Sequence, residues 1–242
     1  MDFVGFYDRY WADKGDRVDR QRLALLAGHV APGQRVLQVD GGPGWLAEMF
    51  QARGAQVTMT DLSHVAVELA RGRGVVAQQC ELDAGPLPFA DAAFDVVVCD
   101  SQLEHRFDPG HALDEMVRVL APGGRLILLL PNTAHWRVRW WLLRGRFPYV
   151  ANTPTDWLHL RFFTLSDTKL LLARRGLVVE QVDGSASLWV KGLYPAWLRR
   201  GLPAKLYARL ARRRPALFAR DFIVVARRWK TEDERRKIEV AR

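Results

Sequence analysis

The chain has 242 residues, about half of them apolar, which is enough to bury a core in one α/β domain. No run of about 18 uncharged apolar residues is present, so no transmembrane segment is expected. The acidic, aromatic N-terminus lacks the apolar stretch of a signal peptide. Two cysteines, Cys80 and Cys99, are expected to be reduced and not bridged, which favours a cytoplasmic protein.

Strand and helix patterns alternate regularly through the first half of the chain. Apolar runs predict strands at residues 35–40, 55–60, 75–80, 94–100 and 125–130. Helical patterns separate them, at about 17–29, 44–53, 63–73 and 110–120. Near-continuous Val, Ile and Leu strands joined by helices are typical of a parallel sheet covered on both faces.

Three local signals mark element ends. Asp61 and Ser63 stand before the third helix as capping residues. The turn Pro122-Gly123-Gly124 is expected to end the fourth helix and lead into the fifth strand.

The alternation breaks after Asn132. Residues 134–160 are rich in Trp and Arg, and we interpret them as a lid insertion. A helix at 166–175 and strands at 177–182 and 220–229 follow, with a basic helical insertion at 184–219 and a charged tail at 231–242. The last two strands lack an ordinary crossover helix, so we expect an antiparallel pair at the sheet edge. The whole chain, 1–242, is interpreted as a single domain.

The strongest motif is a glycine cluster that follows the first strand directly, from Asp40 to Gly44. Glycine lets the backbone turn sharply and lets a ligand lie close to the N–H groups at a helix N-terminus. The second strand ends in Asp61, whose carboxylate suits the two hydroxyls of a ribose. This pair indicates a nucleoside cofactor. Pro43 has no N–H for a pyrophosphate, which argues against NAD.

Further motifs resemble one family, the class I S-adenosylmethionine (SAM) dependent methyltransferases, across residues 35–183. The segments that carry the resemblance are VLQVDGGPG, MTDLS, LDAGPLPFADAAFDVVVCDSQLEH and EMVRVLAPGGRLILLLPN. The resemblance implies a Rossmann-like seven-stranded sheet of order 3-2-1-4-5-7-6 with the seventh strand antiparallel. It also implies SAM as the cofactor and S-adenosylhomocysteine as the product.

The resemblance also assigns cofactor-binding residues. Gly42 and Gly44 would line the methionine part of SAM, and Asp61 would bind the ribose. Asp83, with the backbone of Ala84, would read the adenine edge. Further candidates for the cofactor site are Asp40, Gly41, Leu62 and Ser101.

Two positions depart from the family pattern. Gln38 stands where the family has an acidic residue, and Asp40 stands where it has its first glycine. Residues i and i+2 of a strand face the same side, so we expect Asp40 to replace the missing acid. The alternative is that the Asp40 side chain obstructs the pocket, which would leave a non-catalytic relative.

Methyl transfer to a hydroxyl needs a group that removes its proton, and histidine is the usual base. We expect His105, at the carboxyl edge of the sheet, and His159, in the lid, to be the catalytic residues. No cluster has the spacing of metal ligands, so no metal is expected. The lid is similar to that of bacterial methyltransferases of polysaccharide and glycolipid biosynthesis, and of a methyltransferase-like accessory protein of methionine biosynthesis. The first likeness implies O-methylation of a sugar, a glycolipid or another small acceptor, and the second a non-catalytic partner protein.

The net charge of +9 comes from the C-terminal quarter, where residues 189–242 hold 16 Lys and Arg against 5 Asp and Glu. Leu198, Leu202, Leu206 and Leu210 recur among these basic residues. The pattern is typical of a basic amphipathic helix, so residues 195–214 are candidates for peripheral contact with an anionic membrane. A helix packed on the sheet, with its arginines in water, is the alternative. The hypothesis that the protein is an RNA methyltransferase rests on this basicity alone, and no nucleic-acid partner is expected.

Overall fold

The computed structural model describes residues 2–14 and 18–231. The expected tail therefore lies outside it, apart from Thr231. The described part of the chain forms two compact units. Unit 1 comprises Met1–Asp100, Gly110–Ile127 and Arg227–Arg242, and unit 2 comprises Ser101–Pro109 and Leu128–Ala226.

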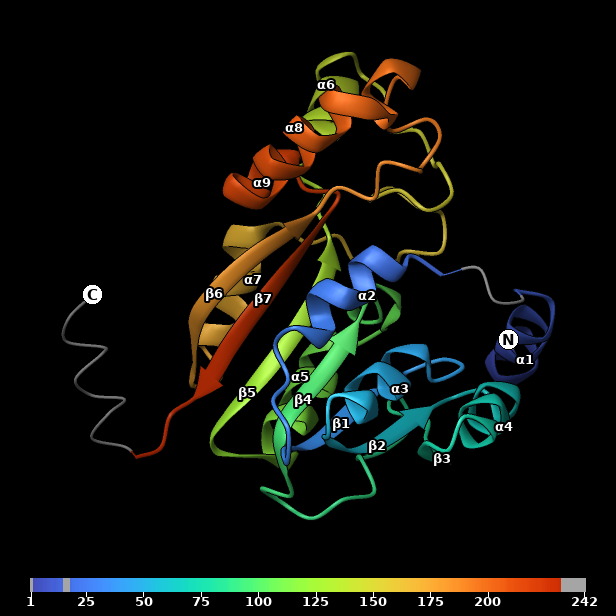
Figure 1. Cartoon of the computed structure of the whole chain (residues 1–242), viewed down its shortest axis with the longest axis vertical. Helices are drawn as coiled ribbons and strands as arrows, with labels where there is room; N and C mark the ends of the chain where they lie inside the picture. Colours follow the sequence, from blue (N-terminus) through green and yellow to red (C-terminus); the bar gives the residue numbers. More distant parts are fainter. Residues whose placement is uncertain (1, 15–17, 232–242) are drawn as a thin grey trace. The chain divides into compact units, whose positions relative to one another are not determined.

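One seven-stranded sheet runs in the order β3-β2-β1-β4-β5-β7-β6, as predicted. The strands are β1 (Arg35–Val39), β2 (Gln56–Asp61), β3 (Val76–Gln79), β4 (Phe94–Asp100), β5 (Leu120–Pro131), β6 (Leu177–Ser185) and β7 (Asp221–Arg228). β1 pairs in parallel with β2 and with β4, and β2 with β3. β7 runs antiparallel to its neighbour β6, which confirms the expected edge pair (Figure 1).

In unit 1 two helices precede β1, and the others lie between strands. The helices are α1 (Phe3–Lys14), α2 (Arg20–Ala27), α3 (Trp45–Ala52), α4 (His64–Gly72) and α5 (Pro109–Val119). Pro109, the first residue of α5, belongs to unit 2. α3 packs on β2, and α4 packs on β2 and β3. Successive residues of β1 and β4 are buried, among them Val36, Leu37 and Val96. Neighbouring side chains on a strand point to opposite faces, so both faces of this part of the sheet are covered.

The capping role predicted for Ser63 is confirmed, whereas the prediction of a turn at residues 122–124, before the fifth strand, is wrong. The Ser63 hydroxyl accepts a hydrogen bond from the Ala66 backbone N–H and so caps α4. α5 ends at Val119, and β5 begins at once with Leu120, so Pro122, Gly123 and Gly124 lie inside the strand. A β-carbon on Gly124 would come within 2.9 Å of the Asp95 carbonyl oxygen, which explains the glycine there.

Unit 2 adds the insertions. α6 (Trp136–Leu143) and the short helix η1 (Leu103–His105) precede α7 (Leu165–Ala173), and η2 (Ala196–Arg199), α8 (Gly201–Arg213) and α9 (Pro215–Phe218) fill the second insertion. A separate apolar cluster holds the insertions together, with Leu193, Tyr194, Leu198 and Tyr207 among its buried members. Leu198 belongs to η2 and is buried, so the leucine row expected on one continuous helix begins at Leu202.

Cys80 and Cys99 are both free thiols, as predicted. No helix in the described part of the chain has both the length and the apolar composition needed to cross a bilayer.

Candidate functional site

The glycine loop of unit 1 joins the end of β1 to the start of α3 through left-handed backbone. Its φ angles are 50° at Asp40, 60° at Gly42 and 81° at Gly44. A β-carbon on Gly42 would lie 2.7 Å from the Trp11 ring, so this position has no room for a side chain. The absence of a side chain at Gly42 therefore makes room for the Trp11 ring.

Asp61, the last residue of β2, is tied to this loop. Its two carboxylate oxygens accept hydrogen bonds from the backbone N–H of Gly42 at 2.7 Å and of Ser63 at 2.9 Å. The side chain is almost completely buried, and this burial raises the pKa of Asp61 to about 6. A carboxylate has about four lone-pair sites, so the two backbone bonds leave capacity for two ribose hydroxyls.

Gln38 and Asp40 are two residues apart in sequence but do not lie on one face of a strand. β1 ends at Val39, and Asp40 has a left-handed conformation, so strand alternation does not extend to it. The argument that placed Asp40 and Gln38 on the same side is therefore wrong. An aspartate in this conformation is strained relative to glycine, which explains why a glycine suits the position.

The buried Gln38 side chain supports the fit of a cofactor at this loop. Its Oε1 atom has no hydrogen-bond partner within the described residues, although its Nε2 faces the Gly41 carbonyl oxygen at 3.5 Å. A buried acceptor of this kind costs free energy until a donor reaches it. SAM carries an ammonium group on its methionine end, and this group can donate to the Gln38 Oε1 atom. The resemblance implies that Gly42 and Gly44 line the methionine part of SAM and that Asp61 binds the ribose.

Helix α1 belongs to the same region, and the sequence interpretation did not find it. Its Asp8 carboxylate accepts hydrogen bonds from the Ser63 hydroxyl at 2.5 Å and from the Val65 backbone N–H at 3.2 Å. Trp11 covers Gly42 and meets Trp45 edge to face, with ring centroids 6.1 Å apart. Aromatic residues three and four positions apart in this segment were the signal that could have predicted the helix.

Among the other predicted cofactor residues, Leu62 contributes a backbone N–H that lowers the pKa of Asp61. Leu62 is half-buried between Asp61 and Ser63. Asp83 and Ala84 are exposed in a turn after β3, in which the Ala84 N–H donates to the Glu81 carbonyl oxygen. Ser101 lies in unit 2, has a φ of 56°, and donates its N–H to the Leu129 carbonyl oxygen at 3.0 Å. The adenine-binding roles of Asp83 and Ala84 stay predictions.

In unit 2, the structure brings the two predicted catalytic histidines together. The His105 and His159 rings are 5.1 Å apart between centroids and meet edge to face. The buried Glu104 carboxylate joins them, and one ligand atom from each of the three residues lies within 4.8 Å of the others. Burial lowers the pKa of His105, and burial with the neighbouring His105 lowers the pKa of His159 to about 4. This trio has the atom types that a metal ion needs, which sequence spacing did not reveal.

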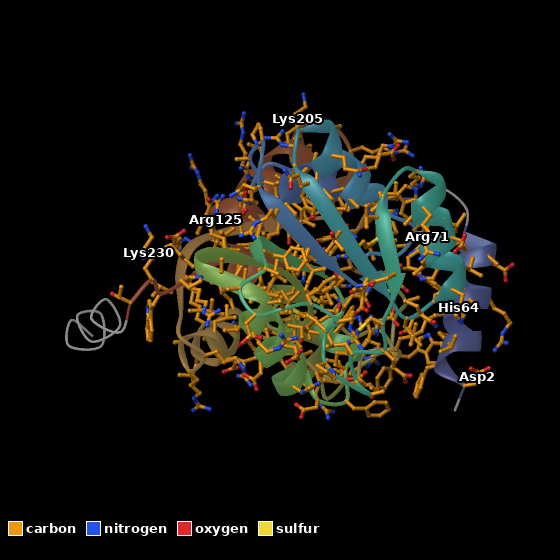
Figure 2. All side chains as sticks on the ribbon, turned by 90° about the horizontal axis from the view of Figure 1, so that it is seen from below. Asp2, His64, Arg71, Arg125, Lys205 and Lys230 are labelled. Carbon is orange, nitrogen blue, oxygen red and sulfur yellow. The ribbon has the colours of Figure 1, made fainter. Side chains whose placement is uncertain are left out.

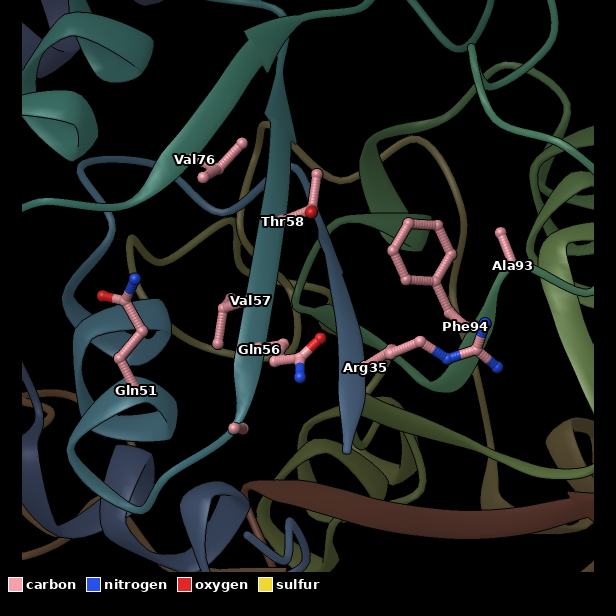
Figure 3. Close-up of a pocket in the computed structure, with 9 residues that line it drawn as sticks. Arg35, Gln51, Gln56, Val57, Thr58, Val76, Ala93 and Phe94 are labelled. Carbon is pink, nitrogen blue, oxygen red and sulfur yellow. The ribbon is translucent and has the colours of Figure 1, made fainter. Parts of the chain in front are cut away.

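Two hollows of the surface are lined by residues of neither group. One is lined by Arg35, Gln56, Thr58, Val76 and Phe94, at the amino ends of the strands of unit 1 (Figure 3). Parallel α/β sheets bind their ligands at the carboxyl ends of the strands, where Asp40 and Asp61 lie.

Curated proteins similar in sequence to this chain include methyltransferases. A demethylmenaquinone methyltransferase of Renibacterium salmoninarum is 37% identical over 45% of this chain and 46% of its own length. A ubiquinone biosynthesis O-methyltransferase of Idiomarina loihiensis is 32% identical over 58% of this chain and 62% of its own length. The chain thus spans about half to three fifths of the curated relatives it matches.

Solved structures show the same fold. An S-adenosylmethionine-dependent methyltransferase of Mesorhizobium loti superposes with a TM-score of 0.60, over 86% of this chain and 96% of its own, at 20% identity. A geranyl diphosphate methyltransferase, solved with GPP and sinefungin, gives a TM-score of 0.62 over 88% of this chain and 78% of its own, at 16% identity. The fold is that of the SAM-dependent methyltransferases, and SAM is the cofactor these relatives imply.

Within that class, the family described as "Methionine biosynthesis protein MetW" matches residues 20–199. The chain belongs to this family. The resemblance to the methyltransferase-like protein of methionine biosynthesis is therefore confirmed, whereas the resemblance to polysaccharide-type enzymes stays a prediction.

Proposed function

We propose that the protein transfers the methyl group of SAM to an oxygen of a small acceptor. The observation that carries the proposal is the bonded pair of Gly42 and Asp61, which ties a buried carboxylate to the glycine-containing turn after β1. SAM supplies an activated methyl group on its sulfonium, so the protein has to bind, orient and deprotonate. We assign the ribose to Asp61, and the catalytic role expected of His105 and His159 stays a prediction.

For the acceptor, we propose a ring hydroxyl on a lipid-linked or similarly amphipathic molecule. Sugars and glycolipids, which the lid suggests, carry such hydroxyls, and one curated relative is named as an O-methyltransferase of ubiquinone biosynthesis. The lid offers matching side chains, because Tyr149 and Trp157 are exposed and the Arg144 guanidinium stacks over the Trp140 ring at 3.9 Å. Incubation with SAM and either a hydroquinone or a glycolipid, with measurement of S-adenosylhomocysteine, separates these acceptors. If no compound with a ring hydroxyl yields S-adenosylhomocysteine, this assignment is contradicted.

We also infer a peripheral contact with anionic membrane through α8. This helix buries Tyr207 and Ala211 and leaves Leu202, Leu206 and Leu210 exposed. Lys205, Arg209 and Arg213 lie on its exposed side, and no carboxylate of the described residues pairs with them; Lys205 projects outward in Figure 2. Exposed leucines beside cations suit a surface of anionic lipid.

A non-catalytic role in methionine biosynthesis is the second candidate function. The observation that favours it is the left-handed Asp40, which puts a side chain where the motif has glycine. A SAM titration of the wild-type chain separates the two functions, since the enzyme requires binding and the partner protein does not.

A further inference from the structure

The strongest unassigned feature is the cluster of Glu104, His105 and His159 in unit 2. Glu104 and His105 are neighbours in η1, and His159 comes from the irregular segment after α6. Two imidazoles and one carboxylate within 4.8 Å of one another form a donor set that transition metals use in proteins.

Backbone hydrogen bonds hold the two contributing segments together. The Glu104 carbonyl oxygen accepts from the Leu160 N–H at 2.8 Å and from the Arg161 N–H at 3.0 Å. The His105 ring reaches the Leu158 carbonyl oxygen at 3.0 Å, one residue before His159. The three side chains are therefore positioned by main-chain contacts on both sides of the cluster, which is the preorganisation that an ion site needs.

Hydrogen bonds to backbone carbonyl oxygens determine which ring nitrogen carries the proton in each of the two histidines. His105 Nδ1 faces the Leu158 carbonyl oxygen, and His159 Nδ1 faces the Pro154 carbonyl oxygen at 3.3 Å. A carbonyl oxygen only accepts, so each Nδ1 carries the proton and each Nε2 keeps its lone pair. Histidines that bind metals commonly donate their second N–H to a backbone carbonyl in this way.

The two imidazoles of the cluster supply nitrogen ligands beside a buried carboxylate. The carboxylate of Glu104, buried in the same cluster, is the anionic ligand that balances a cation.

We propose that Glu104, His105 and His159 bind one zinc-type divalent metal ion, with an open coordination position. Imidazole nitrogens favour zinc over magnesium or calcium, which prefer oxygen ligands. Zinc with three protein ligands keeps one position for an oxygen of water or of a hydroxyl, and lowers its pKa. The role of that position at an acceptor rests on the proposed methyl transfer, but binding of the ion does not.

Titration of the chelator-treated full chain with Co²⁺, followed by visible absorption, tests the site. We expect one Co²⁺ per chain, with bands of a four- or five-coordinate ion that Zn²⁺ abolishes. His159→Ala and Glu104→Gln should each weaken binding at least tenfold. His64→Ala, which removes an exposed histidine of unit 1, is the matched control and should leave the titration unchanged.

Failure of the folded wild-type chain to bind Co²⁺ or Zn²⁺ stoichiometrically at micromolar concentration would overturn the proposal, whatever the variants do. Equal binding by wild type and His159→Ala would overturn it as well, because the ion would then lie elsewhere. SAM affinity is measured separately on the same metal-free sample, so loss of the metal site and loss of the methyltransferase assignment give different results.

Discussion

At the scale of single residues, Asp61 connects the fold to the cofactor. Its carboxylate is buried against Gly42 and Ser63, and burial raises its pKa from 3.8 to about 6. The charged form is therefore disfavoured in the folded chain, so this contribution to stability is full below pH 4 and is lost as the pH rises through 6. Ribose hydroxyls donate to the charged form and would lower the pKa again.

We predict that SAM affinity rises between pH 5 and pH 7 and then levels off. The ligand binds the ionised Asp61 best, so binding releases a proton wherever the free protein still holds one. Calorimetric titrations at several pH values measure the effect. Asp61→Asn, which keeps the shape and removes the ionisation, should bind more weakly and lose the slope. A slope that survives in Asp61→Asn would assign the proton to another group.

A second prediction at this scale concerns Asp40 and Gln38. Asparagine tolerates left-handed backbone, so Asp40→Asn removes the charge without new strain. If the Asp40 carboxylate attracts the ammonium group of SAM, this variant binds SAM several-fold more weakly by calorimetry. The double change Gln38→Asp with Asp40→Gly restores the family pattern and should recover the affinity.

The non-catalytic alternative predicts a different series of affinities. Wild type and Asp40→Asn would show no SAM binding, and binding would appear only in the restored double variant. Tight wild-type binding that is indifferent to Asp40→Asn would exclude both accounts of Asp40.

At the scale of elements, the lid divides into an anchored and an open part. α6 buries Val138, and its Trp136 indole donates to the Tyr207 hydroxyl at 2.7 Å. Beyond it, the backbone N–H groups of Phe147, Tyr149, Val150 and Ala151 donate no hydrogen bond within the described chain. Within the lid, α6 is therefore a regular helix, and its Trp136 and Trp141 pack against the apolar cluster of unit 2.

We therefore predict fast hydrogen exchange at residues 147–151 and slow exchange in α6 without ligand. SAM together with an acceptor should slow the exposed segment if it closes over the acceptor. Exchange followed by mass spectrometry measures both, with β5 as the protected reference. Core-like protection of residues 147–151 in the ligand-free chain would rule out a moving lid.

Helix α8 gives a prediction of its own. Sedimentation should recover more protein with anionic than with neutral vesicles, and added salt should reduce the difference. Changing Leu202, Leu206 and Leu210 together to Ser should abolish binding, whereas Leu170→Ser, at an exposed leucine of α7, should not. Equal and negligible sedimentation with both vesicle types would leave α8 as a solvated helix.

At the scale of the whole molecule, periodicity and motifs were sufficient for the sheet. The apolar residues of β1 and β4 indicated strands, and the resemblance to the methyltransferases implied their order and neighbours. Asp61 was found because it ends the second predicted strand. Boundaries were less accurate where packing decides, as at the start of β5.

Contacts between distant segments could not be predicted in the same way. Glu104 and His159 are far apart in sequence, and hydrogen bonds between their two segments, such as those of residues 160 and 161 to Glu104, bring them together. Trp11 reaches Gly42 through the packing of α1, which no local pattern specifies. The left-handed Asp40 overrides the strand alternation from which its position was inferred.

The central claim is that this chain binds SAM through the glycine loop and Asp61. Calorimetric titration of the full chain with SAM and with S-adenosylhomocysteine tests it most directly. We predict one site per chain, and at least tenfold weaker binding in Asp61→Ala that retains its folded circular dichroism spectrum, which corresponds to about 1.4 kcal/mol. A folded wild-type chain that binds neither compound, or a folded Asp61→Ala variant with unchanged affinity, would contradict the account.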